Sequence, residues 1–139
     1  MKKVYLDSNV LISLIQDEFG KGDEFMSYRT KNFLDKTLNC FYTIVISSLV
    51  LTEIKRITGL QESKVMVWFY GFEDKVEIVQ ISLDEMDKAE IEGKKRGVGR
   101  ADAAHFMLAK RENCSCIVTW NKKHFSVFEG IRICDPSEL

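Results

Sequence analysis

The stretch KVYLDSNVLI, residues 3–12, sets the fold of this chain. Three apolar residues, Val4, Tyr5 and Leu6, lead into Asp7 and include β-branched and aromatic side chains, which is typical of a short buried strand. Ser8 or Asn9 is a suitable N-cap for a helix over about residues 10–16. Asp7 therefore stands where the first strand ends and the first helix begins. In an open α/β sheet, that carboxyl edge is where ligands bind.

The composition is that of one globular domain, and we interpret residues 1–139 as a single unit. The chain is 45% hydrophobic and 29% charged, so it can bury a core. Its 20 Lys and Arg and 21 Asp and Glu residues give a net charge of -1, which argues against a protein that coats nucleic acid indiscriminately. The longest apolar runs are too short to span a bilayer and no signal-peptide pattern is present, so we expect a cytoplasmic protein without a membrane partner.

Two kinds of apolar segment alternate along the chain. Runs rich in β-branched residues predict further buried strands at 43–46, 76–81, 115–119 and 131–134. Helical spacing of apolar residues predicts helices at 23–38, 49–58, 62–72, 85–96 and 100–113. This alternation predicts a three-layer α/β/α sandwich around a parallel sheet of about five strands. The four cysteines follow no zinc-ligand spacing, and we interpret them as small buried hydrophobic residues: Cys40, Cys114, Cys116 and Cys134.

Glu53 is the first further acid that could reach the edge marked by Asp7. On a helix at about 100° per residue, Glu53 lies about 40° from Ile57 and about 60° from Val50, inside the apolar stripe. A carboxylate there needs a partner, because an unpaired buried charge is costly. The alternative is an edge glutamate that reaches water or pairs with a lysine.

Asp102 and Asn121 map to the same edge. Asp102 falls in the first turn of a helix that must deliver the chain to the next strand, so the start of that helix lies at the carboxyl edge. The free N–H groups and the dipole of a helix start would also favour a purely structural aspartate there. Asn121 follows the strand 115–119, either as a site residue or as a turn residue. Thr119 could hydrogen-bond a carboxylate or simply fill the strand.

Clustered oxygens from Asp7, Glu53, Asp102 and Asn121 would repel one another unless a hard cation lay between them. Mg²⁺ and Mn²⁺ prefer such carboxylate and water ligands. A cation held in this way can activate water and neutralise charge on a phosphodiester. We therefore expect these residues to be both metal-binding and catalytic.

Four segments carry a resemblance to a known family: LDSNVLI at 6–12, Glu53 after a serine pair, GRADA at 99–103 and VTWN at 118–121. In order and spacing they resemble the four motifs of PIN-domain proteins, many of which are the ribonuclease toxins (VapC) of toxin–antitoxin pairs. The resemblance covers nearly the whole chain. It implies a parallel α/β/α fold and a ribonuclease that depends on Mg²⁺ or Mn²⁺.

The resemblance also implies roles for single residues. Asp7, Glu53 and Asp102 match the metal-binding acids, and Asn121 occupies the fourth position. The family often has a second aspartate near that fourth position, so the amide here leaves one-metal and two-metal mechanisms open. The metal-supporting residues would be Ser8, Asn9 and Thr119. The two histidines, His105 and His124, receive no catalytic role from the resemblance, and we interpret them as satisfied, partly buried side chains.

The implied partners are an RNA substrate, a second copy of the chain in a homodimer, and an antitoxin. The helices 23–38 and 62–72 carry more aromatic surface than a small core needs, so they are candidate dimer or antitoxin faces. Trp120 could stack an unpaired base. Cations bordering the site could hold phosphates: Lys94, Lys95, Arg96, Arg100, Lys122 and Lys123.

Four other functions can be compared with this one by the residues that each would require. A PIN-like scaffold that binds without cutting would fit missing acids, but three carboxylates are present. An RNA-processing nuclease of the same family would look alike at this level. A phosphoacceptor receiver domain would need an aspartate ending the middle strand, and a haloacid-dehalogenase-type phosphatase would need an aspartate at Asn9; the chain meets neither requirement.

Overall fold

A computed structural model describes residues 2–39 and 41–139 and has a five-stranded sheet at its centre. The strands are β1 (Lys2–Leu6), β2 (Tyr42–Ser47), β3 (Val76–Val79), β4 (Cys116–Val118) and β5 (Arg132–Cys134). The α-helices are α1 (Ser8–Glu18), α2 (Glu24–Leu38), α3 (Ser48–Thr58), α4 (Glu62–Val65), α5 (Leu83–Arg96) and α6 (Arg100–Arg111). The 3₁₀ turns are η1 (Met66–Phe69), η2 (Glu73–Lys75), η3 (Lys122–Phe125) and η4 (Pro136–Glu138).

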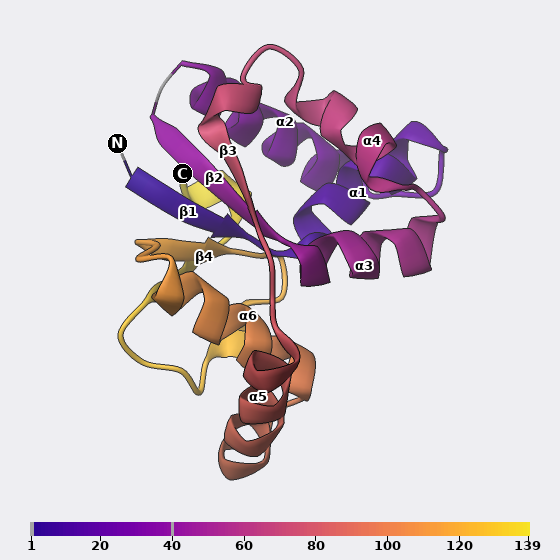
Figure 1. Cartoon of the computed structure of the whole chain (residues 1–139). Helices are drawn as coiled ribbons and strands as arrows, with labels where there is room; N and C mark the ends of the chain where they lie inside the picture. The colour runs from indigo at the N-terminus through magenta and orange to yellow at the C-terminus, as the bar shows by residue number, and fades with distance from the viewer. Residues whose placement is uncertain (1, 40) are drawn as a thin grey trace.

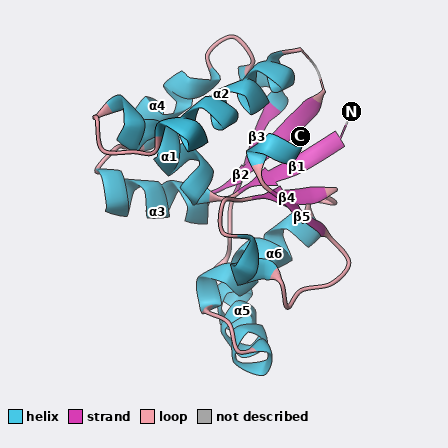
Figure 2. Ribbon diagram, turned by 180° about the vertical axis from the view of Figure 1, so that it is seen from behind, coloured by secondary structure: helices cyan, strands magenta, loops and turns pink. Residues whose placement is uncertain are grey.

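The sheet is parallel throughout and has helices on both sides. Its order is β3-β2-β1-β4-β5, and every neighbouring pair runs parallel. Helices α1 to α4 lie on one side of the sheet, and α5 and α6 lie on the other (Figures 1 and 2). The central strands are therefore covered on both faces, which is why the end of β1, from Val4 to Leu6, is fully buried. The predicted α/β/α fold is confirmed.

The order of the strands creates a crevice beside β1. From β1 the chain builds β2 and β3 to one side, and then crosses over to place β4 and β5 on the other side. The boundary between β1 and β4 is thus the topological switch point, where open α/β sheets bind ligands. Leu6 pairs with Val118 at the carboxyl ends of these strands, so the next residues, Asp7 and Thr119, emerge together at the crevice.

Two predicted details are wrong. The N-cap of α1 is Asp7 itself rather than Ser8 or Asn9, so the helix begins one residue after the strand ends. The predicted helix 62–72 stops being α-helical at Val65 and continues only as the 3₁₀ turn η1. Phe69, the last residue of η1, and Phe72 after it turn into the core and pack edge to face at 5.8 Å, so their rings are not available as surface. Their burial stabilises the tighter turn over a regular helix.

Smaller differences affect chain ends and cysteines. Strand β3 ends at Val79, and the Ile81 N–H leaves the ladder to donate to Ser48 Oγ at 3.1 Å. The free cysteines of the described chain are buried, as expected for small apolar side chains: Cys114, Cys116 and Cys134. Cys40 lies outside the described residues. Within residues 2–39 and 41–139, no helix combines the length and apolar character needed to cross a bilayer.

Gly93 is the point of closest approach between α5 and the loop that leads into α6. A Cβ on Gly93 would lie 2.8 Å from the carbonyl oxygen of Val98, closer than real Cβ contacts allow. Replacing a glycine by alanine inside a helix normally stabilises it by about 1 kcal/mol. Here we predict the reverse: Gly93→Ala lowers the free energy of unfolding by about 1–3 kcal/mol in urea denaturation.

Gly99 supplies the matched control for this prediction. A Cβ on Gly99 would meet nothing within 4 Å, and its φ of -69° suits any residue. Gly99→Ala should therefore change the unfolding free energy by less than about 1 kcal/mol. A Gly93→Ala protein that is as stable as the wild type would show that the loop before α6 can move aside.

Candidate metal centre

The Asp7 carboxylate lies at the end of β1 with only 6% of the residue exposed. Its Oδ1 accepts a hydrogen bond from the backbone N–H of Ser8 at 2.8 Å, and the dipole of α1 favours a negative charge at this position. Its Oδ2 accepts a hydrogen bond from Thr119 Oγ1 at 2.8 Å. Donors on both oxygens fix the orientation of this buried carboxylate.

Thr119 is the centre of a polar network after β4. Because its hydroxyl hydrogen is donated to Asp7, its oxygen acts as acceptor for Asn9 Nδ2 at 3.1 Å and for the Asn121 N–H at 3.0 Å. The Asn9 side chain is fixed in turn, since its Oδ1 accepts the Trp120 N–H at 3.0 Å. Asn9 thus acts on Asp7 through Thr119 rather than by direct contact.

Glu53 reaches the same place from α3, with its side chain 17% exposed. Its Oε1 lies 2.8 Å from His105 Nε2, and the same nitrogen lies 3.8 Å from Asp7 Oδ1. One ligand atom from each of these three residues falls within 4.8 Å of the others. The partner of Glu53 is therefore a buried histidine, not a lysine or bulk water.

The charges in this cluster shift one another. Burial acts to raise the pKa of Glu53, but the hydrogen bond and charge of His105, together with a hydrogen bond from Ser8, lower it overall. Burial disfavours a charged His105, yet the hydrogen bond to Glu53 and the charges of Asp7, Glu53 and Asp102 raise the pKa of His105. The imidazole thus partly compensates an excess of negative charge.

Asp102 lies in the first turn of α6, as the sequence predicted, with its side chain 27% exposed. Partial burial is the main cause that raises the pKa of Asp102; the charges of His124 and His105 oppose it, and those of Asp7 and Glu53 add to it. His124 Nδ1 is 3.7 Å from the Asp102 carboxylate. The Asp102 carboxyl group therefore lies within electrostatic range of Asp7 and Glu53, although it belongs to a helix on the other side of the sheet.

Asn121 takes a more peripheral position. It is exposed, precedes η3, and contacts the network through its backbone N–H on Thr119. In the described part of the chain, its side-chain amide makes no hydrogen bond to Asp7 or Glu53. The structure thus brings the three acids to one edge and leaves Asn121 at the rim.

This set of donors fits a hard divalent cation. Among the described residues, no lysine or arginine lies within ion-pair distance of Asp7, Glu53 or Asp102; their only such partners are histidines. Converging carboxylates with only histidines as partners carry charge that is not fully compensated, which is costly to bury. Their oxygens are the ligands that Mg²⁺ and Mn²⁺ prefer.

The sequence of the chain matches the profile of a protein family. Residues 4–130 match the family profile described as "PIN domain". The chain belongs to the PIN-domain family. The match runs from β1 to the turn before β5, so it contains all four residues of the predicted site: Asp7, Glu53, Asp102 and Asn121. A search of curated proteins finds no match.

Several solved structures resemble this PIN domain in fold. A chain of VapBC2 from Rickettsia felis, solved with a DNA fragment from its promoter, is 22% identical with a TM-score of 0.63, covering 94% of this chain and 96% of that one. A chain of a toxin–antitoxin complex from Klebsiella pneumoniae is 18% identical with a TM-score of 0.62, covering 96% of this chain and 97% of that one. A chain of VapBC-1 from nontypeable Haemophilus influenzae is 17% identical with a TM-score of 0.61, covering 97% of this chain and 98% of that one. At these identities the likeness shows the shared fold.

The sequence did not assign His105 and its contacts to the site of this PIN domain. His105 is 1% exposed, and its second ring nitrogen, Nδ1, lies 2.7 Å from the hydroxyl of Tyr5. Two spacings in the sequence could have indicated that Tyr5 and His105 lie beside the acids. Tyr5 is two residues before Asp7 on a strand, so both point to one face, and His105 is three residues after Asp102 on one helix face.

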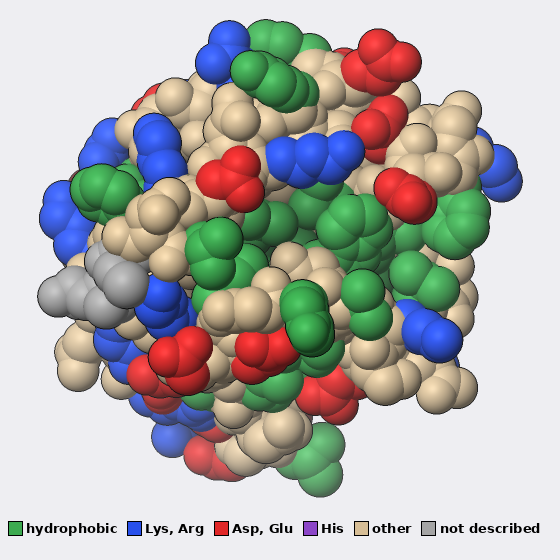
Figure 3. Space-filling view, turned by 90° about the horizontal axis from the view of Figure 1, so that it is seen from above, with side chains coloured by type: hydrophobic (Ala, Val, Ile, Leu, Met, Phe, Trp, Pro, Cys, Tyr) green, Lys and Arg blue, Asp and Glu red, His purple; other side chains and the backbone are tan. Residues whose placement is uncertain are grey.

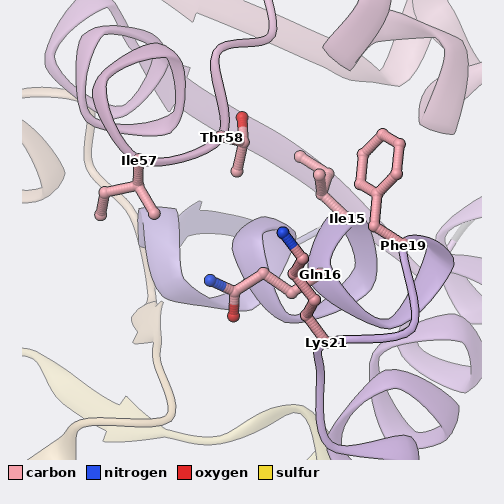
Figure 4. Close-up of a pocket in the computed structure, with 6 residues that line it drawn as sticks. All are labelled: Ile15, Gln16, Phe19, Lys21, Ile57 and Thr58. Atoms are coloured by element: carbon pink, nitrogen blue, oxygen red, sulfur yellow. The ribbon is translucent and has the colours of Figure 1, made fainter.

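Another hollow of the PIN domain has different chemistry. About 280 Å³ in volume, it lies between the far ends of α1 and α3 and is lined by Ile15, Gln16, Phe19, Lys21, Ile57 and Thr58 (Figure 4). The predicted place of Ile57 in the apolar stripe of α3 is wrong, since it is 53% exposed here, whereas Val50 and Ile54 are buried. No carboxylate lines this hollow, so its lining does not suit a hard divalent cation.

Neutralising Asp102 should stabilise the protein when divalent cations are absent. Because the pKa of Asp102 is raised in the folded state, that state binds the proton more tightly, and stability falls as the pH rises through the carboxyl range. Asp102→Asn removes this cost. We expect its melting temperature in EDTA at neutral pH to exceed that of the wild type, and Mg²⁺ to raise it less.

The control for this measurement is Asp87→Asn, which alters an exposed carboxylate of α5 and should change neither value. A melting temperature of Asp102→Asn below the wild-type value in EDTA would show that partial burial and the nearby carboxylates do not destabilise the ionised Asp102.

Proposed function

We propose that this PIN domain is a divalent-metal-dependent endoribonuclease that hydrolyses RNA phosphodiester bonds, and that it is the toxin of a toxin–antitoxin pair. The observation that carries the proposal is the convergence of Asp7, Glu53 and His105 within 4.8 Å at the switch point of the sheet, with Asp102 near enough for the charges of Asp7 and Glu53 to raise its pKa. The similarity in fold to chains of VapBC and other toxin–antitoxin complexes supports the toxin assignment.

In the proposed mechanism, Asp7, Glu53 and Asp102 would hold Mg²⁺ or Mn²⁺. When bound, such a cation supplies an activated water and neutralises charge on the phosphodiester. The protein's own part is orientation. Thr119 and the N-terminus of α1 hold Asp7, while Asn121 offers a neutral amide at the rim for a water or a phosphate oxygen.

Most of the cations that could bind RNA phosphates are already paired with carboxylates. The cations at 94–96 pair with glutamates of their own helix, and Lys122 pairs with Asp135 and Glu138. Arg100 and Lys123 have no ion pair within the described chain, so we assign phosphate binding to them.

A hollow beside the rim suits an unpaired nucleotide. It has a volume of about 350 Å³ and is lined by Trp120, Asn121, Lys122, Lys123 and His124. Trp120 is half-buried, and its indole N–H has no hydrogen-bond partner among the described residues. Stacking on an aromatic ring together with nearby cations is a general way to hold single-stranded nucleic acid.

An exposed apolar face supports the proposed protein partners, a second copy of the chain and an antitoxin. On α2, Phe25 and Tyr28 are 57% and 61% exposed, and Val67 and Tyr70 beside α4 are 65% and 83% exposed. Figure 3 shows hydrophobic side chains gathered around a hollow when the molecule is viewed from above. Large exposed apolar patches commonly mark interaction sites.

We place such a ribonuclease toxin in the cytoplasm, where its RNA substrate would be.

The direct test is cleavage of a labelled RNA panel in Mg²⁺ or Mn²⁺. We expect the wild type to cut, EDTA to abolish cutting, and Asp7→Asn and Asp102→Asn each to lower the rate by about 100-fold or more, because each removes a proposed metal ligand. Asp74→Asn, on exposed η2 at the opposite edge of the sheet, is the matched control and should cut normally. Wild-type rates of cutting by Asp7→Asn and Asp102→Asn would support a binding scaffold instead.

The toxin assignment has its own test. Induced expression of the wild type in bacteria should arrest growth, and the Asp7→Asn variant should not. The arrest should be relieved by co-expressing the product of the neighbouring gene. Metal-dependent RNA cleavage without growth arrest would instead indicate an RNA-processing nuclease outside a toxin system.

A further inference from the structure

A continuous row of buried hydrogen bonds leads from the start of α3 to the side chain of Glu53. Ser47 caps α3 by accepting the Val50 N–H at 3.1 Å, and its Oγ lies 2.7 Å from the Tyr5 hydroxyl. That hydroxyl lies 2.7 Å from His105 Nδ1, and His105 Nε2 lies 2.8 Å from Glu53 Oε1. The row joins β1, the β2–α3 junction and α6.

The Glu53 end of the row fixes its direction, because an ionised carboxylate can only accept a hydrogen bond. With a neutral imidazole, Ser47 therefore donates to Tyr5, Tyr5 donates to Nδ1, and His105 donates its Nε2 hydrogen to Glu53. In an imidazolium Nε2 carries a hydrogen as well, so the bond to Glu53 is the same in both protonation states. Only the tautomer with a bare Nε2 would place two lone pairs against each other at 2.8 Å.

We propose that Tyr5 and His105 are positioning residues that hold the Glu53 carboxylate ready for a divalent cation, an inference that rests on the proposed function. Partners of this kind, which do not touch the ion, orient ligands and tune affinity in metal sites. Because Oε1 is bound to His105, Glu53 can offer its other oxygen, Oε2, to the ion. His105 itself is not a ligand, since its Nε2 electron pair is used by the N–H bond.

The packing around the row supports a positioning role. Tyr5 and Ser47 are fully buried and His105 is 1% exposed, so none of these side chains has room to rotate. Ser47 caps the start of α3 and Glu53 lies near the middle of the same helix, and the row ties both to β1 and α6. Glu53, which is partly exposed and would otherwise sample several rotamers, is thereby held at one place.

The first test measures Mn²⁺ affinity by calorimetry in the absence of RNA. Tyr5→Phe keeps the ring and removes only the hydroxyl, His105→Gln keeps an N–H donor, and His105→Leu removes it. We expect His105→Leu to weaken Mn²⁺ binding by about 10–100-fold, the range found for such supporting residues, and Tyr5→Phe and His105→Gln to weaken it less. In RNA cleavage, Tyr5→Phe should need more Mn²⁺ and recover much of its rate at saturation.

Thr37→Val is the matched control for losing a buried hydroxyl. Thr37 is fully buried in α2 and donates to the Phe33 carbonyl, away from the metal centre. The Thr37→Val substitution should lower the melting temperature without changing the Mn²⁺ affinity. Unchanged affinity in Tyr5→Phe and His105→Gln would overturn the proposal, as would equal losses in Thr37→Val. Because Tyr5→Phe and His105→Gln conserve volume, the test stands even if His105→Leu fails to fold.

The second test observes the histidine directly. The chain contains 2 histidines, so ¹H–¹⁵N spectra of the Mg²⁺-loaded protein can be assigned with a His124→Gln variant. We expect a hydrogen on Nε2 of His105; a bare Nε2, or one bound to the ion, would overturn the proposal. A wild type that binds Mn²⁺ but cuts no RNA would contradict the proposed function alone, whereas one that binds no Mn²⁺ would contradict both.

Discussion

The structure depends on a buried negative charge at the end of β1. Asp7 is almost inaccessible, yet the N-terminus of α1 and the Thr119 hydroxyl keep both of its oxygens hydrogen-bonded. Glu53 and Asp102 add negative charge beside it, and histidines are the only cationic side chains of the described chain within ion-pair distance of the three acids. Such a cluster is stable only if something positive shares it, which a divalent cation can do.

Parallel topology explains why distant residues supply this cluster. The carboxyl ends of β1 and β4 meet at the switch point, and α3 and α6 begin at the same edge. Residues that follow those strands or begin those helices are therefore brought together without any long loop. Asp7, Asp102 and Thr119 could be predicted from this rule, because their position depends only on where elements start and stop.

Other features depend on packing that no local pattern encodes. The 62–72 segment has helical spacing, but burial of Phe69 and Phe72 favours a 3₁₀ turn. Ile57 has the spacing of a core residue, but it lines a surface hollow. His105 is a partner of Glu53 only because α3 and α6 approach one another across β1, and that approach becomes visible only in three dimensions.

If this edge of the sheet binds a divalent cation between the three acids, anomalous diffraction from crystals grown with Mn²⁺ will locate it. We expect a manganese peak bound by Asp7, Glu53 and Asp102, and the loss of that peak in crystals of Asp7→Asn. A wild-type crystal with no peak at this edge, or with manganese bound only elsewhere, would contradict this expectation.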